Sequence, residues 1–202
     1  MRKFTGRELL VATHNSGKLE EIANLLEPFS VSVVGAAKMN LQEPEETETT
    51  FAGNARIKAH AATQATGLPA LADDSGIEID ALGGKPGVYT ANWAETETGR
   101  DFVLAMTKAH DRLLKSGANE PWTARFCCTL VLAWPDGHDE VFPGTIKGQI
   151  VWPMRGNEGH GYDPIFQPSG YNQTFGEMDR WEKNKISHRA TAFAKLVKGC
   201  FD

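Results

Sequence analysis

The N-terminal part of the chain contains a polar loop between an apolar run and a helical pattern. Residues 9–12 are apolar, and residues 19–26 repeat apolar side chains at helical spacing. The loop between them consists of Thr13, His14, Asn15, Ser16, Gly17 and Lys18. A strand that turns through small residues into a helix directs free N–H groups and the positive end of the helix dipole toward one point, and Lys18 adds a full charge there. The pattern predicts a phosphate-binding loop, the alternative being an ordinary strand–helix turn with an incidental lysine.

This loop does not match the Walker-type P-loop. That motif requires a glycine five residues before the Gly–Lys pair and a serine or threonine after the lysine. Ala12 and Leu19 occupy those two positions. The sequence therefore indicates phosphate binding without indicating an ordinary ATPase.

Hydrophobic periodicity along the chain predicts alternating strands and helices. Helical spacing of apolar residues is found in residues 19–26, 51–66, 100–115 and 188–198. Strands are predicted for residues 8–12, 31–34, 70–72, 77–79, 125–134, 140–142 and 145–151, with a turn at residues 135–137. This order is typical of an α/β protein with a mixed β-sheet flanked by helices. We expect one domain over residues 1–202, with two lobes that meet near a structured Gly/Pro-rich loop at residues 82–89.

Charge and hydropathy exclude two classes of protein. The net charge is −5 and no basic stretch is present, whereas proteins that bind duplex nucleic acid cluster Lys and Arg against phosphates. No segment approaches the ~20 apolar residues of a membrane span, and residues 1–6 lead into the first predicted strand without the apolar core of a signal peptide. We expect no nucleic-acid partner, no membrane partner and a cytoplasmic location.

The three cysteines, Cys127, Cys128 and Cys200, form no CxxC spacing. Cys127 and Cys128 fall in a β-like run, where successive side chains point to opposite faces. None of the six histidines has a zinc-ligand spacing to a cysteine. We therefore expect buried, reduced thiols with a structural role.

Two neighbouring aspartates, Asp73 and Asp74, follow the strand predicted at residues 70–72. Open α/β sheets bind ligands at strand ends, and Mg²⁺ commonly takes one or two carboxylates together with substrate phosphates and water. One of these aspartates is therefore a candidate Mg²⁺ ligand, the alternative being a turn rich in Asp, Ser and Gly. The acidic run at residues 43–48 offers a second carboxylate, and its alternative is a solvated loop.

Two C-terminal segments also carry binding chemistry. Residues 156–166 combine glycines, aromatic rings and a carboxylate. Glycines allow close backbone approach to a ligand, and an aromatic ring can stack on a purine for ~1–3 kcal/mol. The alternative for this segment is a turn with buried aromatics. Residues 183–189 form a basic cluster, in which Lys183, His188 and Arg189 are candidate nucleotide contacts and Ser187 is a candidate helix cap.

Taken in order, these segments form a recognisable series. It runs through residues 13–18, Glu45-Glu46-Thr47 with Phe51 and Asn54-Ala55, Asp73-Asp74-Ser75-Gly76, Leu82-Gly83-Gly84 with Pro86-Gly87, Ala124-Arg125-Phe126, residues 161–166 and Ser187-His188-Arg189. The chain resembles the inosine-triphosphate pyrophosphatase family, the Ham1-like enzymes that remove damaged purine nucleotides such as ITP, dITP and XTP. The resemblance extends from the first strand to the last helix. It implies an ITPase-like fold with two lobes around a central cleft, a homodimer, and Mg²⁺-dependent cleavage of a purine nucleoside triphosphate to the monophosphate and pyrophosphate.

The resemblance also implies roles for single residues. Asp74 would be the general base and a metal ligand, and Glu45 the second metal ligand. The triphosphate would be held by Thr13, His14, Asn15, Ser16, Gly17 and Lys18, while Ser75 and Lys183 contact the substrate and His160, Gly161, Tyr162, Asp163, His188 and Arg189 surround base and sugar.

Two positions depart from the family pattern. Gly53 stands where members commonly carry Glu, so a carboxylate near the metal is absent, and His160 stands where Phe is common. An imidazole can stack as a phenyl ring does, but it also donates hydrogen bonds and titrates.

Two other functions are compatible with part of the pattern. A Maf-like pyrophosphatase for modified pyrimidine or 7-methylguanosine triphosphates would share the architecture, although the motifs at residues 161–163 and 187–189 favour the purine family. A non-catalytic nucleotide-binding regulator would explain Gly53, but the retained Asp73, Asp74 and Glu45 favour an enzyme.

Overall fold

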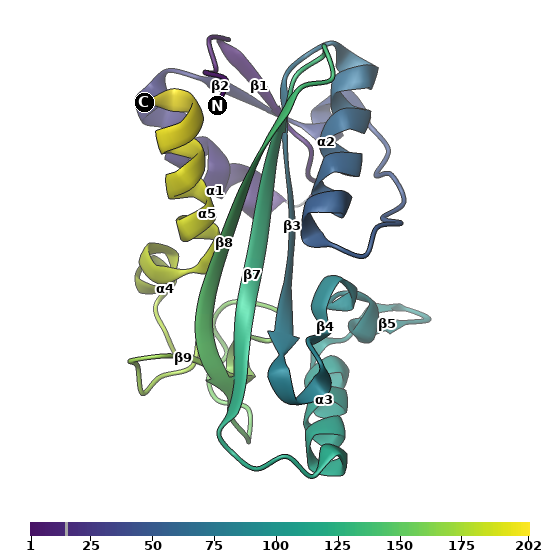
Figure 1. Ribbon diagram of the computed structural model, residues 1–202, viewed down its shortest axis with the longest axis vertical. Coiled ribbons are helices and arrows are strands. Elements are labelled where there is room, and N and C mark those ends of the chain that lie inside the picture. The colour runs from purple at the N-terminus through teal and green to yellow at the C-terminus, as the bar shows by residue number, and fades with distance from the viewer. Residues whose placement is uncertain (15) are drawn as a thin grey trace. The chain divides into compact units, whose positions relative to one another are not determined.

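The computed structural model describes residues 1–14 and 16–202, apart from the side chains of residues 16, 17 and 21. The described residues divide into two compact units. Unit 1 comprises residues 1–74, 129–143 and 192–202, and unit 2 comprises residues 75–128 and 144–191. Residues of both units belong to the strands β3 (Ala70–Ile79), β7 (Trp122–Ala133) and β8 (Asp139–Ile150) and to the helix α5 (His188–Leu196), all labelled in Figure 1.

The main β-sheet is mixed. Its strand order is β2-β1-β3-β7-β8-β9, with β4 beside β3, and a separate ribbon pairs β5 with β6. β1 pairs in parallel with β2 and β3, whereas the β3–β4, β5–β6 and β8–β9 pairs are antiparallel. The strands other than β3, β7 and β8 are β1 (Glu8–Val11), β2 (Ser32–Gly35), β4 (Lys85–Pro86), β5 (Glu95–Thr96), β6 (Gly99–Arg100) and β9 (Phe166–Pro168). The predicted α/β class with a mixed sheet flanked by helices is confirmed.

Unit 1 is built on the parallel strands β1, β2 and β3 and the helices α1 (Ser16–Leu26) and α2 (Phe51–Thr66). Alanines form the buried face of α2 and pack against small apolar residues of β1, β3 and β7. Because alanine is small, this face lets the helix approach the sheet closely. Two short 3₁₀ turns, Glu27–Phe29 and Ala36–Met39, follow α1 and β2.

The helix α2 coincides with the prediction because both of its ends are marked in the sequence. Thr50 is the N-cap, and its Oγ1 accepts a hydrogen bond from the N–H of Gly53 at 3.0 Å. Gly67 ends the helix with φ +70°, a left-handed conformation that glycine adopts without steric penalty. The Thr50 cap fixes the start of α2 directly after the acidic residues that precede it.

Unit 2 packs around one aromatic and aliphatic core. Tyr162, Phe166 and Phe175 are among its fully buried side chains, together with Ile77 and Leu113. Its helices are α3 (Phe102–Ser116), α4 (Arg180–Ile186) and the first turn of α5, and its 3₁₀ turns are Asp80–Leu82, Gly87–Tyr89, Asn92–Ala94 and Asp163–Ile165. The Gly/Pro-rich loop at residues 82–89 is structured, as predicted, because β4 within it pairs with the end of β3.

Two predicted strand breaks are wrong. The sequence predicts separate strands at residues 70–72 and 77–79, but β3 is one strand from Ala70 to Ile79 that includes Asp73 and Asp74. Likewise β8 runs through the interruption predicted at residues 143–144. Local propensity is low at both places, but pairing and side-chain contacts override it. The predicted turn at residues 135–137 is confirmed by the hydrogen bond from Trp134 N–H to the His138 carbonyl.

The helix boundaries are close to those predicted. α1 begins at Ser16, three residues before the predicted start at residue 19, because its polar first turn carries no apolar period. α3 spans Phe102–Ser116 against the predicted 100–115, and α5 passes at Leu196 into a π-helical turn, Val197–Phe201. The strands β4, β5, β6 and β9 and the helix α4 are too short for periodicity to reveal.

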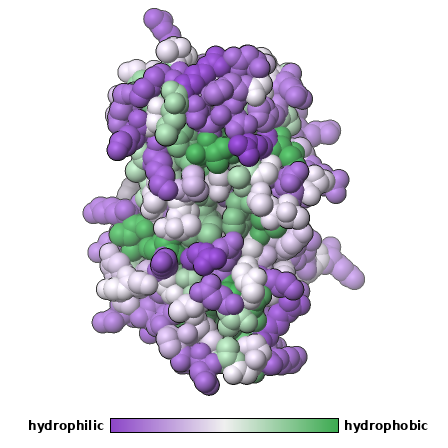
Figure 2. All heavy atoms as spheres, viewed as in Figure 1, coloured by the Kyte–Doolittle hydropathy of each residue, from purple (hydrophilic) through white to green (hydrophobic). Residues whose placement is uncertain are grey.

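The three cysteines are buried and form no disulfide with one another, as predicted. Burial raises the pKa of the Cys127 thiol to about 12 and that of Cys200 to about 11. No helix among the described residues is long and apolar enough to cross a bilayer. On the face of the molecule shown in Figure 2, polar side chains predominate and apolar ones form separate patches. The predicted cleft between two lobes stays a prediction.

Candidate active site

Asp73 and Asp74 lie in β3, just beyond the point where its parallel partner β1 ends. The register pairs Val11, the last residue of β1, with Leu71, and the N–H of Ala12 donates to the Leu71 carbonyl at 2.8 Å. Each aspartate is only 6% exposed. The two carboxylates are thus at the carboxyl end of β1, where ligands of α/β sheets bind, although β3 itself continues.

Lys18, in the first turn of α1, forms an ion pair with Asp73. Its Nζ lies 2.8 Å from Asp73 Oδ2 and 3.1 Å from Oδ1. The side chain of Asp73 is almost completely buried and that of Lys18 is one-quarter exposed. The predicted phosphate-binding lysine therefore lies directly against one of the two predicted acids.

Asp74 contacts two residues of α2. Asn54 Nδ2 donates to Asp74 Oδ2 at 3.3 Å, and Lys58 Nζ lies 3.7 Å from Asp74 Oδ1. Burial raises the pKa of Asp74 from 3.8 to about 6; the charges of Glu46 and Asp73 act in the same direction, against Lys58 and the Asn54 hydrogen bond. A carboxyl with a pKa near 6 is mostly ionised at neutral pH and can still exchange a proton.

Lys58 connects the acidic run to Asp74. Its Nζ lies 2.6 Å from Glu46 Oε1, and the whole residue is 8% exposed. Burial alone would lower the pKa of Lys58, but attraction to Asp74, Asp73 and Glu46 outweighs it and the pKa is raised. Lys58 is therefore a buried, protonated cation.

The sequence prediction missed Asn54 as a contact of Asp74, as well as Lys58 and Glu46. Asn54 and Lys58 are four residues apart on α2, so their side chains lie on the same face. The other buried residues of α2 are three alanines and Thr63. Two polar residues at this spacing on an apolar face are the signal that could have identified them.

The predicted metal ligands, Asp74 and Glu45, are both carboxylates but differ in burial. Asp74 is buried beside Asp73 and Glu46, and carboxylate oxygens are the donors that Mg²⁺ prefers. Glu45 and Glu46 are both exposed, and Glu46 contacts Lys58. Within the described part of the chain no three His, Cys, Asp or Glu side chains form a ready metal cluster. The donor chemistry fits Mg²⁺, which needs only one or two carboxylates when phosphates and water complete its shell.

The predicted phosphate loop leads from β1 into α1. The N–H of Thr13 donates to the Val11 carbonyl at 2.8 Å, and His14 is exposed. Asn15 lies outside the described residues, as do the side chains of Ser16 and Gly17, but α1 begins at Ser16. The first N–H groups of this helix belong to the residues predicted to hold phosphate.

A pocket of about 240 Å³ adjoins this part of unit 1. His14 and Lys58 line it together with the loop at residues 41–44 and alanines of α2. The pocket combines a buried cation with an apolar wall. It therefore brings one predicted triphosphate contact, His14, to the same cavity as Lys58.

Unit 2 contains a second polar cluster, centred on Asp163. Asp163 is 2% exposed, and its Oδ2 accepts hydrogen bonds from Lys183 Nζ at 2.5 Å and from the His160 N–H at 2.7 Å. Gly159 has φ +73°, and a Cβ there would lie 2.1 Å from Asp163 Oδ2. Three predicted substrate contacts, His160, Asp163 and Lys183, are thus held together by direct bonds.

The other residues of unit 2 that are predicted to contact the substrate include buried, stacked and half-buried side chains. Tyr162 is 1% exposed in the core of unit 2, burial raises its pKa, and its hydroxyl has no hydrogen-bond partner in the part of the chain that the structure describes. The His188 ring stacks on Phe126 at 5.0 Å. Arg189 is buried, and Gly161 has φ +70°. Ser187 caps α5, because its Oγ accepts from the N–H of Ala190 at 3.1 Å, and Ser75 is half-buried in β3.

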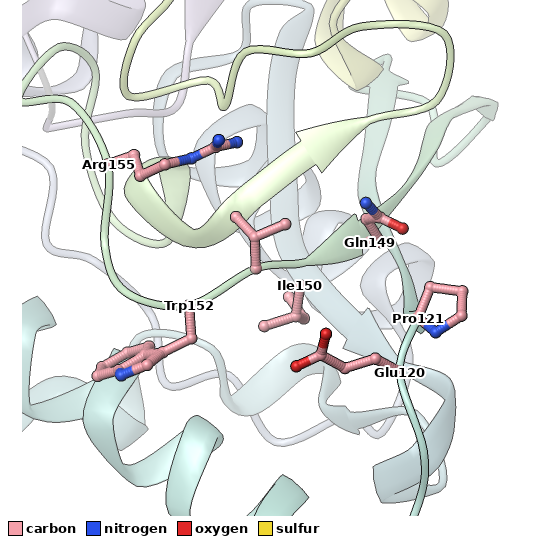
Figure 3. A pocket seen from close by; sticks show the side chains of 7 residues that line it. Glu120, Pro121, Gln149, Ile150, Trp152 and Arg155 are labelled. Carbon is pink, nitrogen blue, oxygen red and sulfur yellow. The ribbon is translucent and has the colours of Figure 1, made fainter.

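A larger pocket of unit 2, about 490 Å³ in volume, contains none of the predicted site residues (Figure 3). Its lining includes Glu120, Gln149, Trp152 and Arg155. The Trp152 ring stacks on His110 at 4.1 Å with an interplanar angle of 6°. Arg155 is engaged by Gln167, the Asn172 carbonyl and Glu177.

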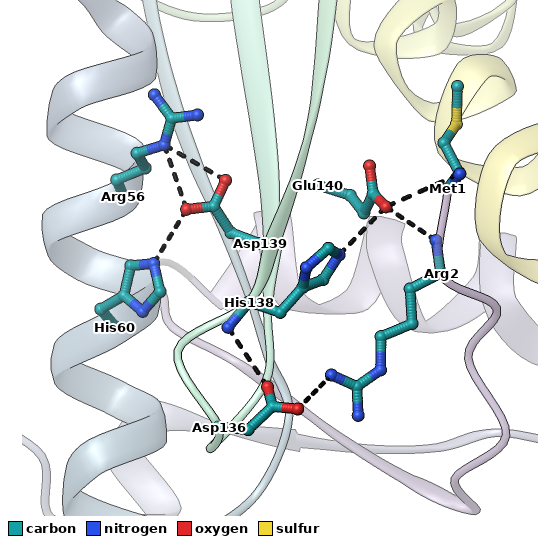
Figure 4. Close-up of polar contacts among 8 residues, drawn as sticks. All are labelled: Met1, Arg2, Arg56, His60, Asp136, His138, Asp139 and Glu140. Carbon is teal, nitrogen blue, oxygen red and sulfur yellow. Dashed lines mark hydrogen bonds and ion pairs between the residues drawn. The ribbon is translucent and has the colours of Figure 1, made fainter.

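A polar network also surrounds the hairpin between β7 and β8 in unit 1 (Figure 4). Asp139 accepts from Arg56 and contacts His60 of α2, while Glu140 contacts His138 and accepts from the N–H of Arg2. No predicted site residue takes part in these contacts. The network connects α2 and the N-terminal segment to the hairpin.

These features define an α/β protein whose buried carboxylates, lysines and helix start are suited to binding phosphate groups. Buried carboxylates, two lysines and the start of a helix lie together in unit 1, and a carboxylate–lysine pair with stacked rings lies in unit 2. Comparison with known proteins identifies the family. The Ham1 family profile matches residues 9–199, and the chain belongs to the Ham1 family.

Individual relatives are similar over their whole length. A protein of Ruegeria pomeroyi named dITP/XTP pyrophosphatase is 71% identical over 200 residues, covering 99% of this chain and 98% of the relative. A protein of Agrobacterium fabrum with the same name is 56% identical over 213 residues, covering 100% of this chain and 100% of the relative. These names describe hydrolases acting on acid anhydrides, so the predicted enzyme class is confirmed at the level of the family.

Solved structures of the family have the same fold. The HAM1 protein from Coxiella burnetii superposes with a TM-score of 0.90 at 35% identity, covering 96% of this chain and 98% of that chain. The nucleoside-triphosphatase / dITP/XTP pyrophosphatase from Mycobacterium abscessus superposes with a TM-score of 0.79 at 36% identity, with 94% and 98% coverage. The predicted resemblance is confirmed.

Proposed function

We propose that this chain is a Mg²⁺-dependent nucleoside triphosphate pyrophosphatase that converts dITP, XTP and ITP to the monophosphate and pyrophosphate. The names of its full-length relatives support the substrate class. The observation that carries the proposal is the cluster of Asp73, Asp74, Lys18 and Lys58, in which all but Lys18 are buried. Paired acids and bases of this kind suit the capture and hydrolysis of a polyanion.

In this proposal the lysines and the start of α1 hold the triphosphate. Lys18 exchanges its contact with Asp73 for phosphate oxygens, and Lys58 adds a second buried charge. The N–H groups of α1 bind the same anion. Together they stabilise the negative charge that accumulates on the departing pyrophosphate.

Asp74 orients the attacking water and accepts its proton. Its raised pKa, about 6, brings the carboxylate closer to the range in which a general base works at neutral pH. Asp74 and a glutamate of the acidic run, Glu45 by the family pattern, would hold Mg²⁺. When bound, the cation neutralises phosphate charge during cleavage.

Unit 2 recognises the purine. The Phe126–His188 stack offers aromatic surface, and Lys183 and Arg189 offer N–H donors. Inosine and xanthosine carry a carbonyl at the purine six-position, whereas adenosine carries an amino group. Donors aimed at that position are left unpaired by adenine, at a cost of several kcal/mol.

A substrate panel tests the proposal. Pyrophosphate release with Mg²⁺ is measured for dITP, XTP, ITP, GTP and ATP, and also for dTTP, UTP and 7-methyl-GTP, which a Maf-like enzyme would prefer. We expect the first three to be hydrolysed fastest, and equal rates for ITP, XTP, GTP and ATP would contradict the proposed discrimination. Tight binding of ITP without pyrophosphate release would indicate a non-catalytic regulator.

Asp74→Asn provides the matched test of the chemistry. It removes the charge at nearly constant volume, and we expect kcat for dITP to fall roughly 10²-fold or more. Near-normal turnover would end the assignment of Asp74. Three expectations stay predictions: a homodimer, a single functional domain over residues 1–202, and a cytoplasmic location. Light scattering on the purified protein measures whether it is a dimer.

A further inference from the structure

Asn54 connects Asp74 to the acidic segment that precedes α2. It stands in the first turn of α2 and is 2% exposed. Its Oδ1 accepts a hydrogen bond from the backbone N–H of Glu48 at 2.9 Å, and its Nδ2 donates to Asp74 Oδ2 at 3.3 Å. Both ends of one buried amide are therefore used.

The bond from Glu48 fixes which end of the amide faces Asp74. A backbone N–H can donate only to an acceptor, so the amide oxygen must point toward Glu48. The NH₂ group then points toward Asp74, where the acceptor is a carboxylate oxygen. The orientation of the amide thus follows from its two partners, and a donor is held against one oxygen of Asp74.

The second α2 contact of Asp74 has a different character. Lys58 Nζ is 3.7 Å from Asp74 Oδ1, beyond hydrogen-bond distance, and makes its short contact with Glu46 instead. An ion pair at that distance supplies charge without a preferred direction, whereas a hydrogen bond is directional. The directional contact from α2 to Asp74 is the one from Asn54.

We propose that Asn54 is a positioning residue for the pyrophosphatase reaction: it fixes the orientation of the Asp74 carboxylate and ties the segment around Glu48 to it. The inference rests on the proposed function. It assigns Asn54 no contact with substrate. Its effect is on turnover, because misplacing a reacting group by about 1 Å can lower a rate by roughly 10²-fold.

Asn54→Asp removes one of the two hydrogen bonds of the Asn54 amide and keeps the other. The substitution keeps an acceptor for the Glu48 N–H and replaces the donor facing Asp74 by an oxygen. Asn54→Ser is the second variant, since its short hydroxyl cannot reach both partners. The control is Thr63→Val, on the same helix and also 2% exposed, which removes only a hydrogen bond from Thr63 Oγ1 to the His60 carbonyl.

Three measurements are made on the full chain: kcat and KM for dITP with saturating Mg²⁺, hydrogen exchange at the Glu48 amide, and thermal unfolding. We expect Asn54→Asp to lower kcat by roughly 10–100-fold, with KM within about threefold and the Glu48 amide still protected. Asn54→Ser should lower kcat and also lose that protection. Thr63→Val should keep kcat within about twofold.

The wild-type rate separates a failure of the proposed function from a failure of the role proposed for Asn54. A wild-type enzyme without activity on dITP contradicts the proposed function. With an active wild type, an Asn54→Asp protein that folds and turns over at the normal rate overturns the inference, as does a rise in KM at constant kcat. Loss of folding in both Asn54 variants, or an equal fall of kcat in Thr63→Val, also overturns it, because the role of Asn54 would then be general stability.

Discussion

The stem of Glu48 fills the space that a side chain at residue 53 would need. A Cβ on Gly53 would lie 2.6 Å from Glu48 Cβ and 2.7 Å from its Cγ. Carbon atoms in good contact are about 3.5–4.0 Å apart, so Gly53→Ala must displace Glu48. Glu48 Cβ is bonded directly to the backbone, whose N–H donates to Asn54. Displacing the side chain therefore also weakens that hydrogen bond.

The size of the effect follows from three contributions. Overpacking typically costs ~1–3 kcal/mol, weakening the hydrogen bond about 1 kcal/mol, and alanine gains about 1 kcal/mol over glycine within a helix. Gly53→Ala should thus destabilise the protein by about 1–3 kcal/mol. In a Glu48→Gly background the obstructing atoms are absent, so Gly53→Ala should be about 2–4 kcal/mol less unfavourable there than in the native sequence. The contact of 3.0 Å to Thr50 Oγ1 is common to both backgrounds and cancels.

Thermal unfolding of four proteins measures this coupling: the wild type, Gly53→Ala, Glu48→Gly and the double variant, all in one metal-free buffer. At ~2–4 °C per kcal/mol for a chain of this size, Gly53→Ala should lower Tm by roughly 2–12 °C in the native sequence. Beside Glu48→Gly the change in Tm caused by Gly53→Ala should be more favourable by roughly 4–16 °C. An equal change of Tm in both backgrounds would refute the steric reasoning.

Two further predictions concern buried polar groups. The pKa of Asp74 is raised from 3.8 to about 6 in the fold, so the ionised carboxylate destabilises the native state above about pH 6 and this penalty disappears as the pH falls through 6 toward 4. Asp74→Asn should therefore raise Tm near pH 8 in metal-free buffer, by the equivalent of at most about 3 kcal/mol, and have little effect near pH 4; an equal shift at both pH values would contradict this. Tyr162→Phe removes a buried hydroxyl without a partner among the described residues and should leave the free energy of unfolding unchanged or raise it by about 1 kcal/mol. Chemical denaturation measures this, and a loss above about 1 kcal/mol would mean that the hydroxyl is bonded in solution.

The parts of the fold that follow from the sequence are those with local signals. The periodicity that predicts a helix over residues 51–66 agrees with α2 to the residue, and in the fold Thr50 and Gly67 cap its two ends. β3 was predicted as two pieces because Asp, Ser and Gly are poor strand formers. In the fold, Lys18 and Asn54 bind the carboxylates of this strand and so offset its low strand propensity. These two residues are 55 and 20 positions away in the sequence. A local sequence pattern therefore cannot show that β3 is continuous.

The candidate site likewise contains residues that a local motif predicts and residues that only tertiary packing shows. Asp74, Lys18 and the Asp163 segment were identified because each lies in a motif. Which glutamate of the acidic run contacts Lys58 depends on tertiary packing, and in the fold it is Glu46. Lys58 was missed, and Asn54 was named in a motif but given no role, because a lysine and an asparagine on a helix are usually solvated and only burial reveals their contacts.

The buried cysteines have a practical consequence for experiments on this protein. Thiolate is the species that reacts with maleimides and oxidants, and pKa values of about 12 for Cys127 and about 11 for Cys200 leave almost none at neutral pH. Cys128 is fully buried. A cysteine engineered on the surface should therefore take a fluorophore or spin label selectively in the native background. Probes attached in this way to unit 1 and unit 2 could report distances during turnover without prior removal of the natural thiols.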